Sequence, residues 1–209
     1  PLLDRIRPVF HWLRHKGVDL QTPSRRDALN AFTMQQRLLA GRQVKTIIDG
    51  GGHHGLVARQ YAQLFRDAKV YSFEPTPATF QVLSRNVSGF GAVEPVNAAI
   101  CDRDGDVEFY IDEVEQANSL LPRNSGDAAA GSPSPQRSVR VKMVRLETFL
   151  VQKGLDRVDI LKLDLEGFEL QALRGCGRLL DEGRADLLYI ETRFDDEDRG
   201  ATTFPQLCE

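Results

Sequence analysis

Short apolar runs alternate with segments of helical spacing from residue 44 to residue 190. The runs have the length of buried strands, and the segments between them are long enough to cross from one strand to the next. Strands that alternate with helices in this way form parallel sheets covered by helices on both faces. The pattern predicts strands at 44–49, 69–73, 92–97, 158–163 and 187–190, and helices at 55–65, 77–87, 146–153 and 168–180.

Two further segments, 107–111 and 139–144, alternate apolar and polar residues and predict an extra strand pair after the third strand. The small residues and prolines of 127–136 predict a mobile loop between them, for which a substrate lid and a plain surface loop are equally favoured. Beyond Glu191 the acidic run 195–198 predicts no further strand.

The N-terminal part has a different pattern. Residues 27–40 place apolar side chains at helical spacing and end at Gly41, which predicts a helix. Residues 1–16 mix apolar side chains with Arg and Lys, so a helix packed on the domain or on a homodimer partner is favoured, with peripheral membrane contact as the alternative. We therefore expect a helical appendage at 1–42 and the main domain at 43–209.

Composition narrows the function classes. The chain has 209 residues, a net charge of −3 and 41% apolar residues, which suit one core and give no field for binding nucleic acid. A small molecule or a glycan is therefore a better candidate for the substrate than nucleic acid. Three scattered cysteines, no membrane-spanning apolar run and no signal peptide predict a cytoplasmic protein without a disulfide framework or zinc site.

A glycine turn, residues 49–55 (DGGGHHG), follows the first predicted strand, and Glu74 follows the second. Glycines let backbone amides approach a ligand, and an acid at a strand end accepts hydrogen bonds from ribose hydroxyls. Because Asp49 precedes the glycines, it repels a pyrophosphate and suits a ligand with an ammonium group. The pattern favours S-adenosylmethionine over a dinucleotide; the alternative is a turn that only permits tight packing.

Charged residues cluster in the stretch 160–169, where Lys162, Asp164 and Glu166 alternate with apolar residues. We expect them at the C-terminal tip of a central strand, with Glu191 at the same sheet edge. Such acids orient a hydroxyl and accept its proton, and Asp164 is the first candidate for the base, followed by Glu166 and Glu191. An exposed strand end that feeds a helix, or a divalent-ion site, is less favoured; no metal is predicted.

Two histidines, His53 and His54, lie inside the glycine turn, and histidine is a side chain that can act as a general base. A purely local hydrogen-bonding role is favoured for each over a role as general base. His53 is also counted among the predicted cofactor-binding residues because of its place in the turn.

These motifs together resemble the FkbM family of methyltransferases over residues 40–192. The resemblance rests on residues 49–55, 73–75 (FEP), 97–100 (NAAI), 118–120 (NSL) and 161–167 (LKLDLEG). It implies a Rossmann-like fold and S-adenosylmethionine-dependent O-methylation of a hydroxyl on a sugar or a natural-product-like molecule. By position it implies that Asp49, Gly51 and Gly55 line the methionine part, that Glu74 binds the ribose, that Asn97 and Ala98 flank the adenine, and that Asp164 and Glu166 lie next to the methyl group and the acceptor.

The chain also departs from the family pattern, because family members usually have Ala-Asn where this chain has Gly52-His53. Two alternatives to a methyltransferase follow. The first is a non-catalytic binding or scaffold protein of the same fold. The second is a nicotinamide-dependent oxidoreductase, which is disfavoured by Asp49 and by the absence of a GxGxxG motif.

Overall fold

The computed structural model describes residues 31–111, 137–192 and 203–207. The chain divides into two compact units, residues 1–41 and 42–209. In the first, helix α2 (Ala31–Leu38) is described. The sequence predictions for residues 1–16, 118–120, 127–136 and 195–198 lie outside the described residues.

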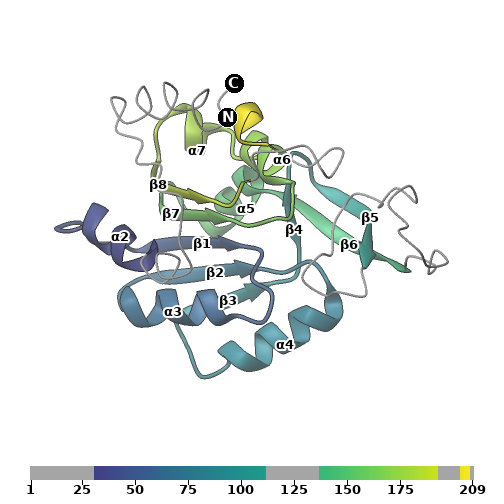
Figure 1. Ribbon diagram of the computed structural model, residues 1–209, viewed down its shortest axis with the longest axis horizontal. Helices are drawn as coiled ribbons and strands as arrows, with labels where there is room; N and C mark the ends of the chain where they lie inside the picture. Colours follow the sequence, from purple (N-terminus) through teal and green to yellow (C-terminus); the bar gives the residue numbers. More distant parts are fainter. Residues whose placement is uncertain (1–30, 112–136, 193–202, 208–209) are drawn as a thin grey trace, which may run out of the picture. The chain divides into compact units, whose positions relative to one another are not determined.

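The second unit is organised around a five-stranded, all-parallel sheet with the strand order β3-β2-β1-β7-β8 (Figure 1). Its strands are β1 (Thr46–Gly50), β2 (Lys69–Phe73), β3 (Val93–Val96), β7 (Val158–Leu163) and β8 (Ala185–Ile190). Pro95 is accommodated in β3 because this strand lies at the sheet edge, where one side needs no partner. Since the chain steps outward from β1 to β3 and later adds β7 on the other side of β1, the strand order reverses between β1 and β7.

Helices cover both faces of this sheet, as the sequence predicted. Helices α3 (Leu56–Leu64) and α4 (Pro77–Val87) follow β1 and β2 and lie together in Figure 1. Helices α5 (Leu146–Lys153), α6 (Glu169–Arg174) and α7 (Arg178–Asp181) belong to the other side of the core. There, Phe149 of α5 packs edge-on against Tyr71 and Phe73 of β2, with ring centroids 5.3 and 4.8 Å apart. The Rossmann-like fold expected from the sequence is confirmed.

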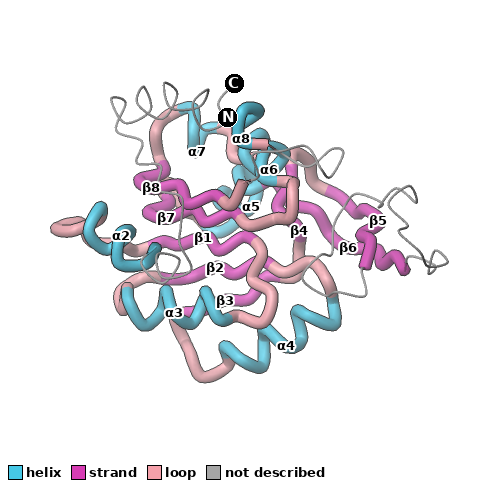
Figure 2. Tube along the Cα trace, viewed as in Figure 1, coloured by secondary structure: helices cyan, strands magenta, loops and turns pink. Residues whose placement is uncertain are grey.

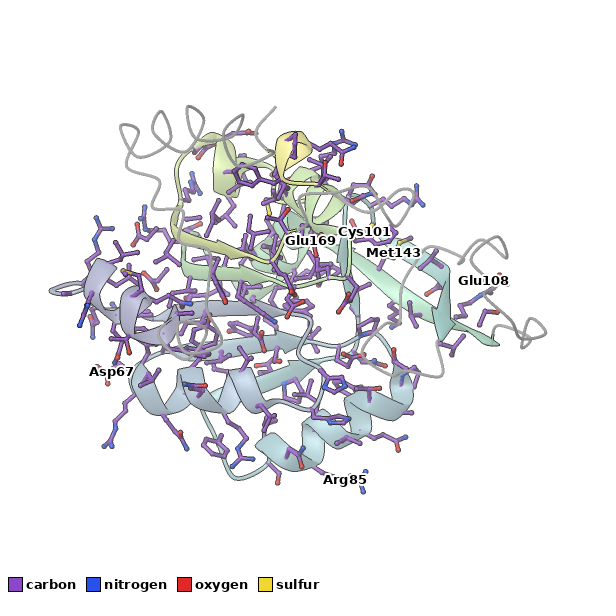
Figure 3. The ribbon with its side chains drawn as sticks, in the orientation of Figure 1. Asp67, Arg85, Cys101, Glu108, Met143 and Glu169 are labelled. Carbon is purple, nitrogen blue, oxygen red and sulfur yellow. The ribbon has the colours of Figure 1, made fainter. Side chains whose placement is uncertain are left out.

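A separate three-stranded sheet has the order β4-β6-β5 and is drawn in magenta beside the main sheet in Figure 2. Strands β5 (Gly105–Ile111) and β6 (Arg137–Arg145) form the predicted antiparallel pair. Strand β4 (Ala99–Cys101) pairs in parallel with β6, and Cys101 and Met143 lie near one another in its small core (Figure 3). The chain therefore leaves the main sheet after β3 and enters a second sheet within a few residues.

Two sequence predictions need correction. The predicted helix 168–180 is two short helices, α6 and α7, because Gly175 passes the β4 backbone and Gly177 has a φ of 50°. A Cβ on Gly175 would lie 1.9 Å from the carbonyl oxygen of Cys101. The last strand begins at Ala185 rather than at residue 187. The last described helix is α8 (Phe204–Leu207), and no helix in the described ranges is long and apolar enough to span a membrane.

Replacement of Gly175 by alanine tests the close approach between α6 and β4. The backbone of Gly175 is right-handed helical, so alanine suits its conformation, and only the contact with Cys101 opposes a side chain. We expect Gly175→Ala to lower the free energy of unfolding by about 1–3 kcal/mol in urea denaturation. Gly89→Ala is the control, because a Cβ there meets nothing within 4 Å; equal stability of the two variants would contradict the contact.

Candidate functional site

The glycine turn after β1 is held against the end of β2. The amides of Gly51 and Gly52 donate to the carbonyl oxygen of Phe73 at 3.1 and 2.7 Å. Gly51 has a φ of 80°, and a Cβ on it would lie 1.9 Å from the carbonyl oxygen of Asp164. Only glycine satisfies both the left-handed backbone and this approach, so the turn and the tip of β7 form two touching walls of one site.

Asp49 is buried, and its carboxylate is bound by groups of the protein itself. Ser72 Oγ donates to Asp49 Oδ2 at 2.7 Å, and Lys162 Nζ lies 3.2 Å from Asp49 Oδ1. The sequence predicted that Asp49 would meet a ligand's ammonium group, but in the structure Lys162 supplies that ammonium. Lys162 itself was expected at the strand tip and instead lies inside β7, with 4% of its side chain exposed.

The departure at Gly52 has a local cause. A Cβ on Gly52 would lie 2.2 Å from Ser72 Oγ, the hydroxyl that binds Asp49. Glycine at this position leaves room for the serine. Gly55 is also fixed by packing, because a Cβ there would lie 2.8 Å from Leu83 and 2.9 Å from Val87 of α4. Gly55 therefore brings α3 and α4 together and is not a cavity-lining residue.

Glu74 lies where β2 ends, and its side chain is fixed by backbone amides. Its Oε2 accepts from the amide of His53 at 3.1 Å, and its Oε1 accepts from the amide of Thr76 at 2.9 Å. Asn97 donates through Nδ2 to the carbonyl oxygens of Glu74 and Pro75 at 2.8 and 2.9 Å. Asn97 thus supports the segment that carries Glu74, whereas its neighbour Ala98 lines the cavity.

The predicted acids meet beyond the tips of β7 and β8. Asp164 and Glu191 share a hydrogen bond, which together with burial and the charges of Asp164 and Glu166 raises the pKa of Glu191 to about 8. Burial works against ionisation of Asp164, but the hydrogen bond with Glu191 and the Lys162 ammonium outweigh it and lower the pKa of Asp164. At neutral pH, Asp164 is therefore the carboxylate and Glu191 the protonated donor.

One functional residue escaped the sequence prediction. Glu169, labelled in Figure 3, is buried at the start of α6, and its Oε1 accepts from the amides of Leu165 and Gly167 at 2.7 and 3.3 Å. These bonds fix the loop in which Glu166 adopts a left-handed φ of 52°. The available signal was an acid three residues after Glu166, at a predicted helix start, where capping acids occur.

A cavity of about 350 Å³ lies between these walls, a size typical of small-molecule sites. Several apolar residues line it as well, among them Leu56, Val57, Ile100 and Phe168. Of the predicted site residues, those that line the cavity are Gly51, His53, Glu74, Ala98, Asp164, Glu166 and Glu191. Asp49, Gly55 and Asn97 do not line the cavity and instead support residues that do. No three His, Cys, Asp or Glu side chains among the described residues are arranged to hold a metal ion.

His53 has a left-handed backbone with a φ of 44°, and its ring stacks on that of His54 with centroids 3.8 Å apart. The protonated form of its ring favours the ionised form of Asp164 and so contributes to the lowered pKa of that acid. The backbone amide of His53 donates to Glu74, and the role of its ring stays a prediction from the sequence.

The structure combines a parallel α/β sheet of the Rossmann-like type with a cavity where the strand order reverses, a glycine turn on one wall and acids on the other. The model of the methyltransferase FkbM domain matches residues 49–209, and the chain belongs to this methyltransferase family.

Similar proteins carry related names. The chain is 29% identical over 153 residues to methyltransferase sdnD of Sordaria araneosa, covering 62% of this chain and 59% of that protein. It is 29% identical over 156 residues to methyltransferase 1 of Beauveria bassiana, covering 68% and 61%. It is 23% identical over 164 residues to the 2-O-methyltransferase NoeI of Sinorhizobium fredii, covering 73% and 64%. The chain thus spans about six-tenths of the length of these relatives.

The proton shared by Asp164 and Glu191 makes stability depend on pH. Because the pKa of Glu191 is raised from 4.5 to about 8, the folded protein holds a proton there that the unfolded chain releases between these values. The contribution of Glu191 is full below pH 4.5 and falls as pH rises toward 8. We expect Glu191→Gln to lose this dependence, so that its Tm minus that of the wild type increases from pH 5 to pH 8; a constant difference in calorimetric scans would contradict the shared proton.

Proposed function

We propose that this chain is an S-adenosylmethionine-dependent methyltransferase that methylates a hydroxyl of a sugar or a natural-product-like small molecule. The observation that carries this proposal is the cavity at the β1–β7 reversal, where the glycine turn and Glu74 lie opposite Asp164, Glu166 and Glu191. Family membership supports methyl transfer, and the name of one relative, a 2-O-methyltransferase, supports a hydroxyl acceptor.

The residues present fit such a cofactor. Glu74 is an acceptor already oriented by two backbone amides, which suits the hydroxyls of a ribose. The glycine turn brings backbone close to the cavity without side chains in the way, and Ala98 and Ile100 give the small apolar wall that an adenine needs. The cofactor would thus be bound in one half of the cavity by Gly51, Gly52, Glu74 and Ala98.

Asp164 is the residue that we assign as general base. When bound, S-adenosylmethionine would supply an activated methyl group for the acceptor oxygen, with S-adenosylhomocysteine as the leaving group. Asp164 takes the proton of the acceptor hydroxyl, for which its ionised state at neutral pH suits it. Protonated Glu191 holds Asp164 in place, and Glu166 lies in the same wall. The acceptor itself, a cytoplasmic location and a homodimer stay predictions from the sequence.

Calorimetry with S-adenosylhomocysteine tests the cofactor assignment. We expect saturable binding with one site per chain, and no competition by NADH. If the folded protein binds NADH, detected by its fluorescence, and not S-adenosylhomocysteine, the proposal fails in favour of an oxidoreductase. Cofactor binding without turnover on a broad panel of sugars and hydroxyl compounds would instead favour the scaffold alternative.

The base is tested by Asp164→Asn, which keeps the size of the side chain and removes the proton acceptor. We expect kcat for the acceptor found in that panel to fall by about 100-fold or more while S-adenosylhomocysteine still binds. Asp156→Asn is the control, since the side chain of Asp156 is 92% exposed and its nearest cation, Arg184, is 3.8 Å away. Normal turnover of Asp164→Asn would remove Asp164 from the role of base.

A further inference from the structure

Lys162 makes four polar contacts at the centre of the site. Its Nζ donates to the carbonyl oxygens of Gly50 and Gly51 at 3.0 and 3.1 Å. The same atom lies 3.2 Å from Asp49 Oδ1 and 3.4 Å from Asp164 Oδ2. One ammonium group thus contacts the end of β1, the glycine turn and the tip of β7.

A buried charge at this place requires compensation. Lys162 lies in a central parallel strand and is paired in register with Asp49 of β1, where apolar side chains are the rule. Burial opposes its charge, but Asp49 and Asp164 outweigh that effect and raise the pKa of Lys162. The ammonium is therefore retained at neutral pH, and its cost of desolvation is offset by the two carboxylates and two carbonyl groups.

The contacts join two parts of the site that have different tasks. Gly51 belongs to the wall assigned to the cofactor, and Asp164 is the assigned base. We propose that Lys162 is a positioning residue for methyl transfer, which holds the glycine turn and the Asp164 carboxylate in one fixed relation so that cofactor affinity and base ionisation depend on the same ammonium. The catalytic part of this inference rests on the proposed function.

Other titratable groups also surround Asp164. From the loop after β7 comes Glu166, from β8 and its end come Tyr189 and Glu191, and from the glycine turn comes His53. The hydrogen bond from Glu191 favours the ionised form of Asp164, and so do the charge of Lys162 and that of His53 in its protonated form. Among the described neighbours of Asp164, Lys162 is the one that carries a positive charge over the whole neutral range. Its removal is therefore expected to raise the pKa of Asp164.

The experiment compares four variants. Lys162→Met keeps most of the length of the side chain and removes the charge, but it leaves Asp49 buried without its cation. The double variant Asp49→Asn/Lys162→Met removes both charges, and Asp49→Asn alone is its reference. Lys142→Met is the matched control, because Lys142 is an exposed lysine of β6 that does not line the cavity. Cooperative unfolding is measured first, to establish which variants fold.

Two quantities are then measured on the folded proteins. The first is the pKa of the Asp164 carboxyl in cofactor-free protein, by carbon-13 NMR titration with Asp164→Asn as the assignment standard. We expect it to rise by about 1–3 units without Lys162, the effect of an opposite charge at this distance. The second is the Kd for S-adenosylhomocysteine, which we expect to increase by about tenfold to 100-fold as the turn loses its fixed geometry. Lys142→Met changes neither.

The outcomes separate the two proposals. An Asp164 pKa or a Kd that stays at the reference value in a folded variant without the ammonium overturns the role of Lys162. Failure of both Lys162 variants to fold also overturns it, because the ammonium would then be needed for the fold alone. Absence of S-adenosylhomocysteine binding by the wild type counts against the proposed function, and in that case the NMR titration still decides whether Lys162 sets the ionisation of Asp164.

Discussion

A buried ammonium group, that of Lys162, lies between the two central strands of the sheet and contacts Asp49, Asp164 and the carbonyl oxygens of the glycine turn. Burial of an unpaired charge costs a large free energy, so the register between the strands must place polar partners beside this ammonium group. The pairing of β1 with β7 sets Asp49 beside Lys162. The contact therefore depends on the pairing of β1 with β7, and it connects the glycine turn to the ionised Asp164.

The contact of Lys162 lies where the strand order reverses between β1 and β7, next to the cavity. Parallel strands that diverge at this point leave space beyond their carboxyl ends, and the cavity lies there. Backbone approach at Gly51 and the fixed carboxylate of Glu74 form one side, whereas the acids of β7 and β8 form the other. In the function that we propose for this FkbM-family chain, the first side binds the cofactor and the second binds the acceptor.

Much of the fold was predictable because buried parallel strands are short apolar runs, and β2, α4, α5 and β7 have the predicted bounds. The errors fall where tertiary contacts override local spacing. The break between α6 and α7 arises from the passage of Gly175 along β4, and helical periodicity carries no information about that neighbour. Similarly, the run predicted as one strand at 92–97 ends early, and the chain then enters another sheet as β4.

For the site, the sequence by itself determined which residues stand at the carboxyl edge of the sheet: the glycines after β1, Glu74 after β2, Asp164 after β7 and Glu191 after β8. Local spacing suffices for this, because strand ends follow from the apolar runs. Only the tertiary structure decided which side chains meet. In the folded chain Lys162 lies beside Asp49, and Asn97 and Gly55 support neighbouring segments of the site. Glu169 binds the backbone of the loop after β7. Such pairings depend on register between segments distant in the chain, which no local pattern encodes.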